Sequence, residues 1–243
     1  MMDGNLYFNT SAMGDFPFTT EQFLQVFREY NQAIWPAQGV GYMLGGVILW
    51  LLVNKRRGSA DTYINSILGL FWIWMGVAYH MVFFAAINPA AYIFGTFFMV
   101  QGIAFVMLSR SEVKLYYGFH RDSYGSTGML FILYAMVIYP VLGYLLGHGY
   151  PESPVFGVAP CPTTIFTFGV LLQARGGVPL WLLVIPAFWS LIGFSAALHL
   201  TIYEDVGLVI AGVGGVLMLW YRNGRPNNTP AADPGRAAKS SKL

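Results

Sequence analysis

The residues best suited to chemistry lie at positions 199–205, where one apolar segment turns into the next. His199, Tyr203, Glu204 and Asp205 place an imidazole, a phenol and two adjacent carboxylates in that turn. A second imidazole, His80, lies within an earlier apolar segment. Ionisable groups at or inside a membrane span are costly, so they are functional candidates by default. These side chains are therefore the first place to look for a bound ligand.

Two kinds of chemistry suit these groups. His80, His199 and Glu204 are predicted as ligands of a divalent transition metal, because imidazole and carboxylate bind such ions. The histidines are equally suited to relaying protons, since imidazole has an ordinary pKa of about 6.5. In the structural alternatives, each histidine donates to a backbone carbonyl between helices, and Asp205 caps the positive end of a helix. The sequence requires no cofactor, so a metal is an option rather than a necessity.

A second candidate region is the Pro-Cys-Pro stretch at 160–162. We expect these prolines to interrupt an apolar span and to free backbone carbonyls, some of which Thr163 and Thr164 can satisfy. Cys161 either presents a thiolate to a soft ligand or packs as a small buried residue beside a kink. It is the only cysteine, so an internal disulfide and a zinc cluster of several thiolates are excluded.

The composition indicates which elements must position these residues. Apolar residues make up 56% of the chain and charged residues 10%, and the mean hydropathy is +0.55. Soluble domains carry about 25% charged residues, so this chain is predicted to be an integral membrane protein. A helix that crosses the bilayer needs roughly 20 apolar residues, and the continuous apolar runs favour helices over the alternating strands of a β-barrel. The predicted spans are 35–53, 63–87, 90–108, 128–146, 155–173, 179–200 and 205–221.

The distribution of positive charge predicts the orientation, because cytoplasmic loops of membrane proteins are enriched in Lys and Arg. With the N-terminus outside, the outer side receives only Arg28. The fold class is then all-α: an integral membrane seven-helix bundle with the N-terminus outside and the C-terminus cytoplasmic. The expected location is a bacterial inner membrane. The inner side receives Lys55, Arg56, Arg57, Arg110, Lys114, Arg121, Arg175, Arg222 and Arg225.

The predicted domains are an extracytoplasmic arm at 1–34, the transmembrane domain at 35–221 and a disordered cytoplasmic tail at 222–243. Within the arm, Phe23, Phe27, Tyr30 and Ile34 recur at helical spacing, and Thr19 with the Gln three residues later forms a candidate capping box. We predict an amphipathic helix that lies on the membrane surface. A partner-facing or disordered arm is the alternative.

A short internal likeness links two of the predicted spans. Phe71-Trp72 is followed by Gly76 and His80, and Phe188-Trp189 is followed by Gly193 and His199. Spans one and five also both begin near prolines, and proline-interrupted segments at corresponding positions are typical of transporter binding sites. The likeness predicts two parallel groups of three helices joined by a linker helix.

This plan resembles that of the small seven-helix sugar facilitators, although their Pro-Gln dipeptide is absent here. The Cys-Pro-Thr-Thr stretch at 161–164 and the turn at 199–205 also resemble those of an uncharacterised family of bacterial multi-pass membrane proteins. That family has no assigned activity, so the resemblance implies a membrane location and no chemistry.

Three functions are compatible with these observations. The leading hypothesis is a carrier or channel for a small solute or ion, with its site in the outer half between spans one, two, five and six. The second is a membrane enzyme or redox protein whose His80 and His199 ligate a metal or a haem. The third is a non-catalytic scaffold or assembly subunit that uses the N-terminal helix and the loop 115–124. The expected partners are the lipid bilayer and a small solute or ion; a homo-oligomer is compatible with the sequence, and nothing in it supports nucleic-acid binding.

Overall fold

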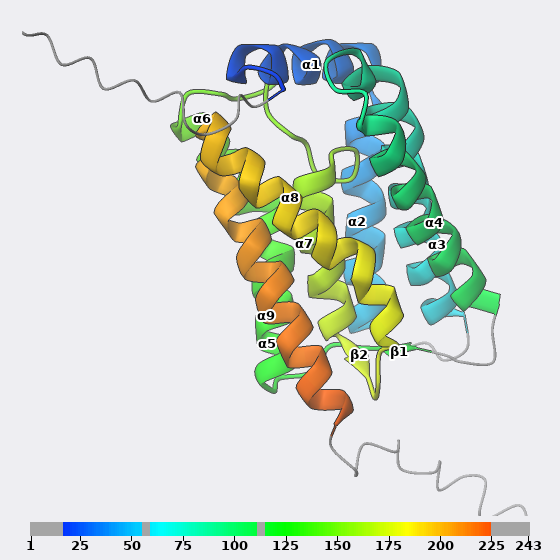
Figure 1. Cartoon of the computed structure of the whole chain (residues 1–243). Helices are drawn as coiled ribbons and strands as arrows, with labels where there is room; N and C mark the ends of the chain where they lie inside the picture. Colours follow the sequence, from blue (N-terminus) through cyan, green and yellow to red (C-terminus); the bar gives the residue numbers. More distant parts are fainter. Residues whose placement is uncertain (1–16, 55–58, 111–114, 225–243) are drawn as a thin grey trace, which may run out of the picture.

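The computed structural model in Figure 1 describes residues 17–54, 59–110 and 115–224. The described chain is mostly helical, and its two short strands form one small antiparallel pair. Most helices run along one axis, so the chain passes repeatedly between two ends of a bundle (Figure 1). The elements are α1 (Thr20–Ala33), α2 (Ala37–Val53), α3 (Ala60–Trp74), η1 (Met75–Phe83), η2 (Phe84–Ala86), α4 (Ala91–Arg110), β1 (Tyr116–Tyr117), α5 (Ser123–Leu133), η3 (Tyr134–Ile138), α6 (Tyr139–Leu145), α7 (Pro160–Leu172), β2 (Ala174–Arg175), η4 (Leu180–Leu183), α8 (Val184–Leu200), η5 (Tyr203–Asp205) and α9 (Val206–Asn223).

Several of the helices are long and apolar enough to cross a membrane. In the described ranges there are five such helices, or six if α1 and α2, which meet at 84°, count as one bent span. Continuous helical segments cover Ala60–Ala86, Ala91–Arg110, Ser123–Leu145, Leu180–Leu200 and Tyr203–Asn223. The all-α fold and its membrane character agree with the sequence prediction. The last helix extends to Asn223, so Arg222 belongs to the bundle and not to the predicted tail.

The predicted fifth span is much shorter than expected. Its helix, α7, has 13 residues and begins only at Pro160, so at 1.5 Å per residue it is roughly 20 Å long, against about 30 Å of hydrocarbon. The prolines do not interrupt a helix, as the sequence suggested, but start one, because the first turn needs no N–H donors from its own residues. All 13 residues of α7 are buried, which makes it the central helix of the bundle.

The N-terminal helix α1 forms as predicted, with the Thr19–Gln22 capping box. It lies across one end of the bundle (Figure 1), which we call the α1 end; the end that carries β1 and β2 is the strand end. The apolar stripe of α1 does not face lipid. Phe23, Phe27 and Tyr30 are buried against η1 and η2 in the second hydrophobic cluster of the protein. A helix that lies on the membrane surface and a helix that packs against the end of the bundle show the same amphipathic pattern, so the sequence could not distinguish the two positions.

The internal likeness does not extend to local geometry. Gly76 and His80 lie in η1, a nine-residue π-helix, whereas Gly193 and His199 lie in regular α-helix. Both glycines permit close helix contacts, since a Cβ at Gly76 would lie 2.7 Å from the Gly95 carbonyl oxygen. A Cβ at Gly193 would lie 2.5 Å from Leu208 Cδ2. The shared glycines are thus explained by packing, and the likeness between the two groups of helices stays a prediction.

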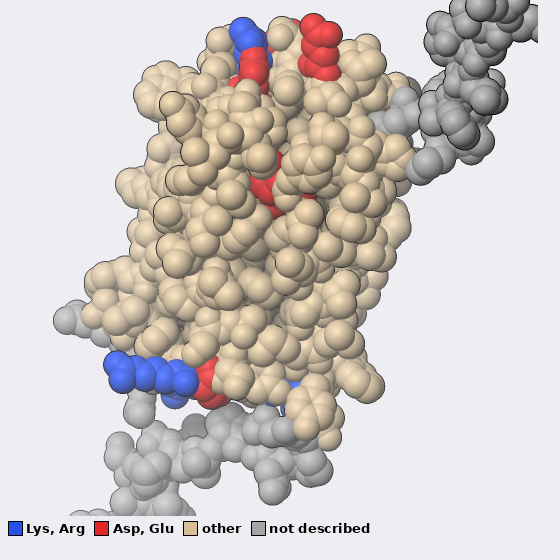
Figure 2. All heavy atoms as spheres, turned by 90° about the vertical axis from the view of Figure 1, so that its left-hand side faces the viewer, with Lys and Arg blue, Asp and Glu red and all other residues tan. Residues whose placement is uncertain are grey.

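The charges of the described residues gather at the two ends of the bundle. Figure 2 shows an uncharged belt between them, in which a few acidic atoms are recessed. Among the described cations, Arg28 lies on α1 and pairs with Glu152. The others lie on helix ends and loops near the strand end: Arg110, Arg121, Arg175 and Arg222. The predicted inner cations at 55–57, 114 and 225 lie outside the described residues.

Candidate functional site

The centre of the candidate site is the first turn of α7. Thr163 Oγ1 accepts a hydrogen bond of 2.9 Å from the Gly157 N–H and so fixes the loop that leads into the helix. The Thr163 carbonyl in turn accepts one from the Thr167 hydroxyl. Thr163 therefore has a structural role, while the buried Thr164 hydroxyl has no protein partner. Between the two prolines, this arrangement leaves Cys161 at the tip of a fully buried helix.

Asp205 lies beside that tip. Its side chain is buried, and its Oδ1 accepts a hydrogen bond of 2.6 Å from the Tyr139 hydroxyl of α6. The Cys161 thiol is its second polar neighbour. Both neighbours are neutral donors, and no Lys, Arg or His pairs with Asp205 in the described ranges. A buried ionised carboxylate normally has a partner of opposite charge. Asp205 is unusual because it has no such partner in the described ranges.

Glu204 belongs to the same turn as Asp205, but its side chain has different neighbours. Its carboxylate is fully buried, and Oε1 lies 3.2 Å from His148 Nδ1, although the approach is not aligned for a hydrogen bond. The Tyr134 hydroxyl donates to the Glu204 backbone carbonyl at 2.7 Å. Gly207 makes room for that ring, because a Cβ there would lie 2.3 Å from it. Glu204 and His148 thus form a buried pair of a carboxylate and an imidazole.

Sequence reasoning missed three of these residues: Tyr134, Tyr139 and His148. Two tyrosines five residues apart would point about 140° apart on a regular α-helix of 3.6 residues per turn. The π-helical segment η3 lies between them, and its wider turn lets both reach the turn at 203–205. His148 lies in the loop after α6, where the spacing of residues carries no signal. No pattern in the sequence would have grouped these three with the carboxylates.

A cavity of about 160 Å³ adjoins this cluster beneath α1. Cys161, Asp205 and Gly193 of α8 lie on its wall. Aromatic rings supply most of the rest: Phe23 and Phe27 of α1, Tyr79 and Phe84 of the η1–η2 segment, Phe94 of α4 and Trp189 of α8. No residue of α2 lines the cavity, so spans two, three, five, six and seven surround it, in place of the predicted one, two, five and six.

His80 lies next to the cavity but is closed off from it. It is fully buried and enclosed by rings, with centroids 4.5 Å away at Phe98 and 5.0 Å away at Trp189. Neither ring nitrogen has a hydrogen-bond partner, which is unusual for a buried polar group. The alternative in which His80 bonds a neighbouring carbonyl is therefore not the one seen.

The other predicted residues do not join the cluster. His199 is exposed, and its Nδ1 lies 2.6 Å from the Ser195 carbonyl of its own helix. Tyr203 is also exposed. In the described ranges, no group of three or more His, Cys, Asp or Glu side chains lies close enough to hold a metal ion. The predicted metal site of His80, His199 and Glu204 is not assembled, because the C-terminal turn of α8 directs His199 away from the buried histidine.

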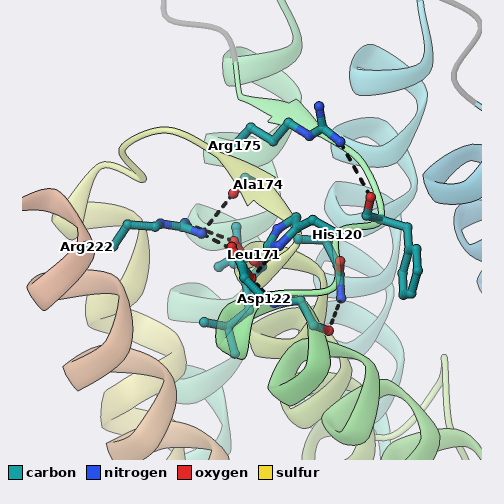
Figure 3. A network of polar contacts seen from close by, with 10 residues as sticks. His120, Asp122, Leu171, Ala174, Arg175 and Arg222 are labelled. Carbon is teal, nitrogen blue, oxygen red and sulfur yellow. Dashed lines mark hydrogen bonds and ion pairs between the residues drawn. The ribbon is translucent and has the colours of Figure 1, made fainter. Parts of the chain in front are cut away.

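At the strand end, the C-terminus of α7 is held by a different network (Figure 3). Arg222 of α9 is buried and donates to the carbonyl oxygens of Leu171, Leu172 and Ala174 at 3.4, 3.3 and 2.8 Å. Its guanidinium also lies 5.2 Å from the centre of the Tyr124 ring. Arg222 therefore caps the central helix and fixes its position along the bundle axis.

Comparison with known proteins locates the chain in one family. A family model described as "Family of unknown function (DUF6064)" matches residues 20–229, which include every element from α1 to α9. No curated protein and no solved structure matches the chain. The family's description names no activity, so the site must be interpreted from its own geometry.

Proposed function

The chain belongs to the DUF6064 family of unknown function, and from its geometry we propose that it is a carrier that binds a small solute with an apolar body in the cavity beneath α1. The cavity carries this proposal. Its walls are mostly apolar and rich in aromatic rings, and a few polar side chains lie among them: Asn88, Cys161, Ser195 and Asp205. Ligand sites are typically concave and apolar with a few convergent polar groups.

The short central helix favours transport of the solute across the membrane over simple binding. Helices that begin within the membrane surround the substrate sites of many transporters, and α7 begins beside the cavity after an irregular segment at 146–159. We also propose seven traverses of the membrane with the α1 end outside. The strand end, which carries four of the five described cations, is then the cytoplasmic side.

The two alternative functions have less support. A haem or metal bound by two histidines requires His80 and His199 to approach each other, but one is enclosed by rings and the other is exposed on the surface of α8. A scaffold requires free contact surfaces. The stripe of α1 is buried within the protein, and so is Tyr117 of the aromatic loop, which leaves Tyr116 as the exposed ring of the tyrosine pair.

Binding can be tested with toluene, because a cavity of similar size, about 150 Å³, accepts benzene in another protein. Toluene should raise the thermal midpoint of the full-length protein in lipid nanodiscs; at 100 times its dissociation constant the stabilisation is about 2.7 kcal/mol. Ile192→Phe fills the cavity and should abolish the effect. Ile185→Phe lies on the same helix outside the cavity lining and serves as the matched control. Equal toluene effects in both variants would exclude this cavity as the site.

Carriage can be tested at Cys161, the only thiol in the chain, which lies on the cavity wall. A carrier must open its site to each side of the membrane in turn. A membrane-impermeant methanethiosulfonate should therefore label Cys161 from either face of sealed, oriented vesicles, and Cys161→Ser should abolish both signals. Labelling from one face only would contradict carriage and leave a binding protein.

A further inference from the structure

We propose that the solute is a small organic cation, with one positive charge on an apolar body about the size of a single ring. This inference rests on the proposed function and specifies its substrate class. A neutral apolar molecule of that size dissolves in hydrocarbon and needs no carrier, whereas a charge inside the membrane is costly. The charge of the solute is therefore what the site must recognise.

The first observation is the missing counter-charge at Asp205. Its two polar neighbours, the Tyr139 hydroxyl and the Cys161 thiol, are uncharged donors. The imidazole of His148 faces Glu204, and Arg28 pairs with Glu152 at the surface. Within the described residues, Glu204 thus has an imidazole beside it and Asp205 has no cationic partner. A ligand cation in the cavity would supply the charge that Asp205 lacks.

The second observation is the aromatic lining. The negatively charged face of an aromatic ring attracts a cation within about 6 Å of its centre, and tryptophan is the most effective ring. Trp189, Tyr79, Phe84 and Phe94 line the cavity together with Asp205. A carboxylate among several rings is the usual arrangement for binding an ammonium group, and its negative charge disfavours an anion.

The lining also argues against a divalent metal cation. Calcium takes six to eight oxygen ligands, and magnesium needs an octahedral set. Asp205 supplies the only carboxylate on the wall, and no metal-binding cluster occurs in the described part of the chain. A ligand that pairs one charge with one carboxylate and covers the rings with carbon fits this wall better.

The volume limits the size of the solute. About 160 Å³ is close to the engineered cavity of about 150 Å³ that accommodates benzene. Benzylammonium, benzyl alcohol and benzoate are therefore suitable probes, since they share one ring and differ in charge. In the full-length protein, benzylammonium should bind at least tenfold more tightly than benzyl alcohol, and benzoate should not bind.

The test compares Asp205→Asn with Glu152→Gln, which neutralises a carboxylate at the surface of the α1 end. Asp205→Asn should weaken benzylammonium at least tenfold and leave benzyl alcohol within about twofold, whereas Glu152→Gln should change neither. Binding that is independent of probe charge would overturn the cation assignment and leave the solute cavity intact. Binding of none of the three probes would overturn both proposals.

A second measurement covers the case in which Asp205→Asn does not fold. The wild-type protein is treated with two methanethiosulfonates of equal length, one carrying an ammonium group and the other a sulfonate. The rate at which each reagent modifies Cys161 is divided by its rate of reaction with a free thiol in solution. The extent of thiol ionisation cancels in the ratio of the two rates. The cationic reagent should react about tenfold faster, and saturating benzylammonium should protect Cys161. Equal normalised rates, or faster reaction of the sulfonate, would refute the proposal.

Discussion

The two ends of α7 are held in opposite ways. At the strand end, Arg222 donates to three carbonyls of the α7 C-terminus and of the residues that follow it. At the α1 end, the helix begins beside a cavity, next to polar side chains without partners: the Thr164 hydroxyl, both nitrogens of His80 and the Trp189 indole N–H. Two buried atoms at the strand end, Gln173 Oε1 and Arg222 Nε, also lack partners, but both side chains are held by hydrogen bonds from their other nitrogens. Native proteins leave few buried polar groups unpaired. The difference indicates that one end supports the fold and the other is kept available for a ligand.

The two tryptophans of the internal likeness show the same contrast. Trp72 donates to Thr167 of α7 at 3.1 Å, whereas the indole N–H of Trp189, which lines the cavity, has no partner. Both rings contact Phe98, so they belong to one aromatic cluster. The two tryptophans therefore differ in role: one holds two helices together through its N–H, and the other has an N–H group without a hydrogen-bond acceptor.

The largest effect should come from breaking the strand-end network. Arg222→Leu removes a charged donor from three carbonyls and should lower the free energy of unfolding by about 3 kcal/mol, because one hydrogen bond to a charged group contributes about 1.5–3 kcal/mol. Arg175→Leu is the control, because Arg175 is exposed and its bond to Phe119 is 3.5 Å long; surface changes usually stay within about 0.5 kcal/mol. Unfolding in mixed micelles would measure both. Equal losses would mean that Arg222 is not the cap of α7.

The next effect has the opposite sign and lies at the α1 end. His80→Phe removes two unpaired nitrogens from a shell of rings, and replacing a buried polar group by an apolar one of similar shape is neutral or stabilising. We expect a gain of about 1–2 kcal/mol in the same unfolding measurement. A clear destabilisation would show that His80 has a hydrogen-bond partner in the folded protein. His80 would then no longer count among the unpaired groups of the α1 end.

Tyr117→Phe is the strand-end counterpart of that change. The Tyr117 hydroxyl donates to Asn65 Oδ1 at 2.7 Å, and both residues are buried. Removing the hydroxyl leaves the amide oxygen unsatisfied, and we expect a loss of about 1–2 kcal/mol. If His80→Phe and Tyr117→Phe shift stability in the same direction, the proposed difference between the two ends is wrong.

The smallest effect is a pH dependence at the start of α5. Partial burial alone would raise the pKa of Asp122, but hydrogen bonds from the Gly125 N–H and from His120 outweigh it and hold the pKa below its ordinary value. A carboxyl with a depressed pKa stabilises the fold above its unfolded pKa, about 3.9, and this stabilisation is lost as the pH falls through the folded pKa. Thermal midpoints measured from pH 6 to pH 3 should decline less in Asp122→Asn than in the wild type. Parallel declines would assign the acid sensitivity to other groups.

The sequence predicted the elements better than their roles. Apolar length located the membrane helices, and the spacing of Phe23, Phe27 and Tyr30 located α1. It could not reveal that the same stripe covers a cavity, because lipid and protein interiors select the same residues. The Pro-Cys-Pro stretch was correctly chosen as a special position, yet the direction of its effect was wrong, since a proline favours the first turn of a helix as strongly as it disrupts a later one.

The candidate site was predicted only in part. Cys161 and Asp205, both chosen from the sequence, lie together on the cavity wall, and Glu204 is buried close by. His199 and Tyr203 were chosen because of their residue type and position, but the left-handed residue Thr201 ends α8 there and both side chains are exposed. The residues that contact this acidic turn are Tyr134 of η3, Tyr139 of α6 and His148 of the loop after α6. Those contacts depend on tertiary packing, which residue spacing alone does not encode.

The complete burial of α7 has a consequence for how substitutions are tolerated. In the described ranges, every other long helix has an exposed side, as in α4, where the buried positions Ala91, Gly95, Phe98, Gly102 and Phe105 recur at helical spacing. In α7 there is no such side, because all 13 positions are enclosed by protein. A saturation mutagenesis profile should therefore rise and fall with a period of 3.6 residues along α4, and should stay uniformly intolerant along α7.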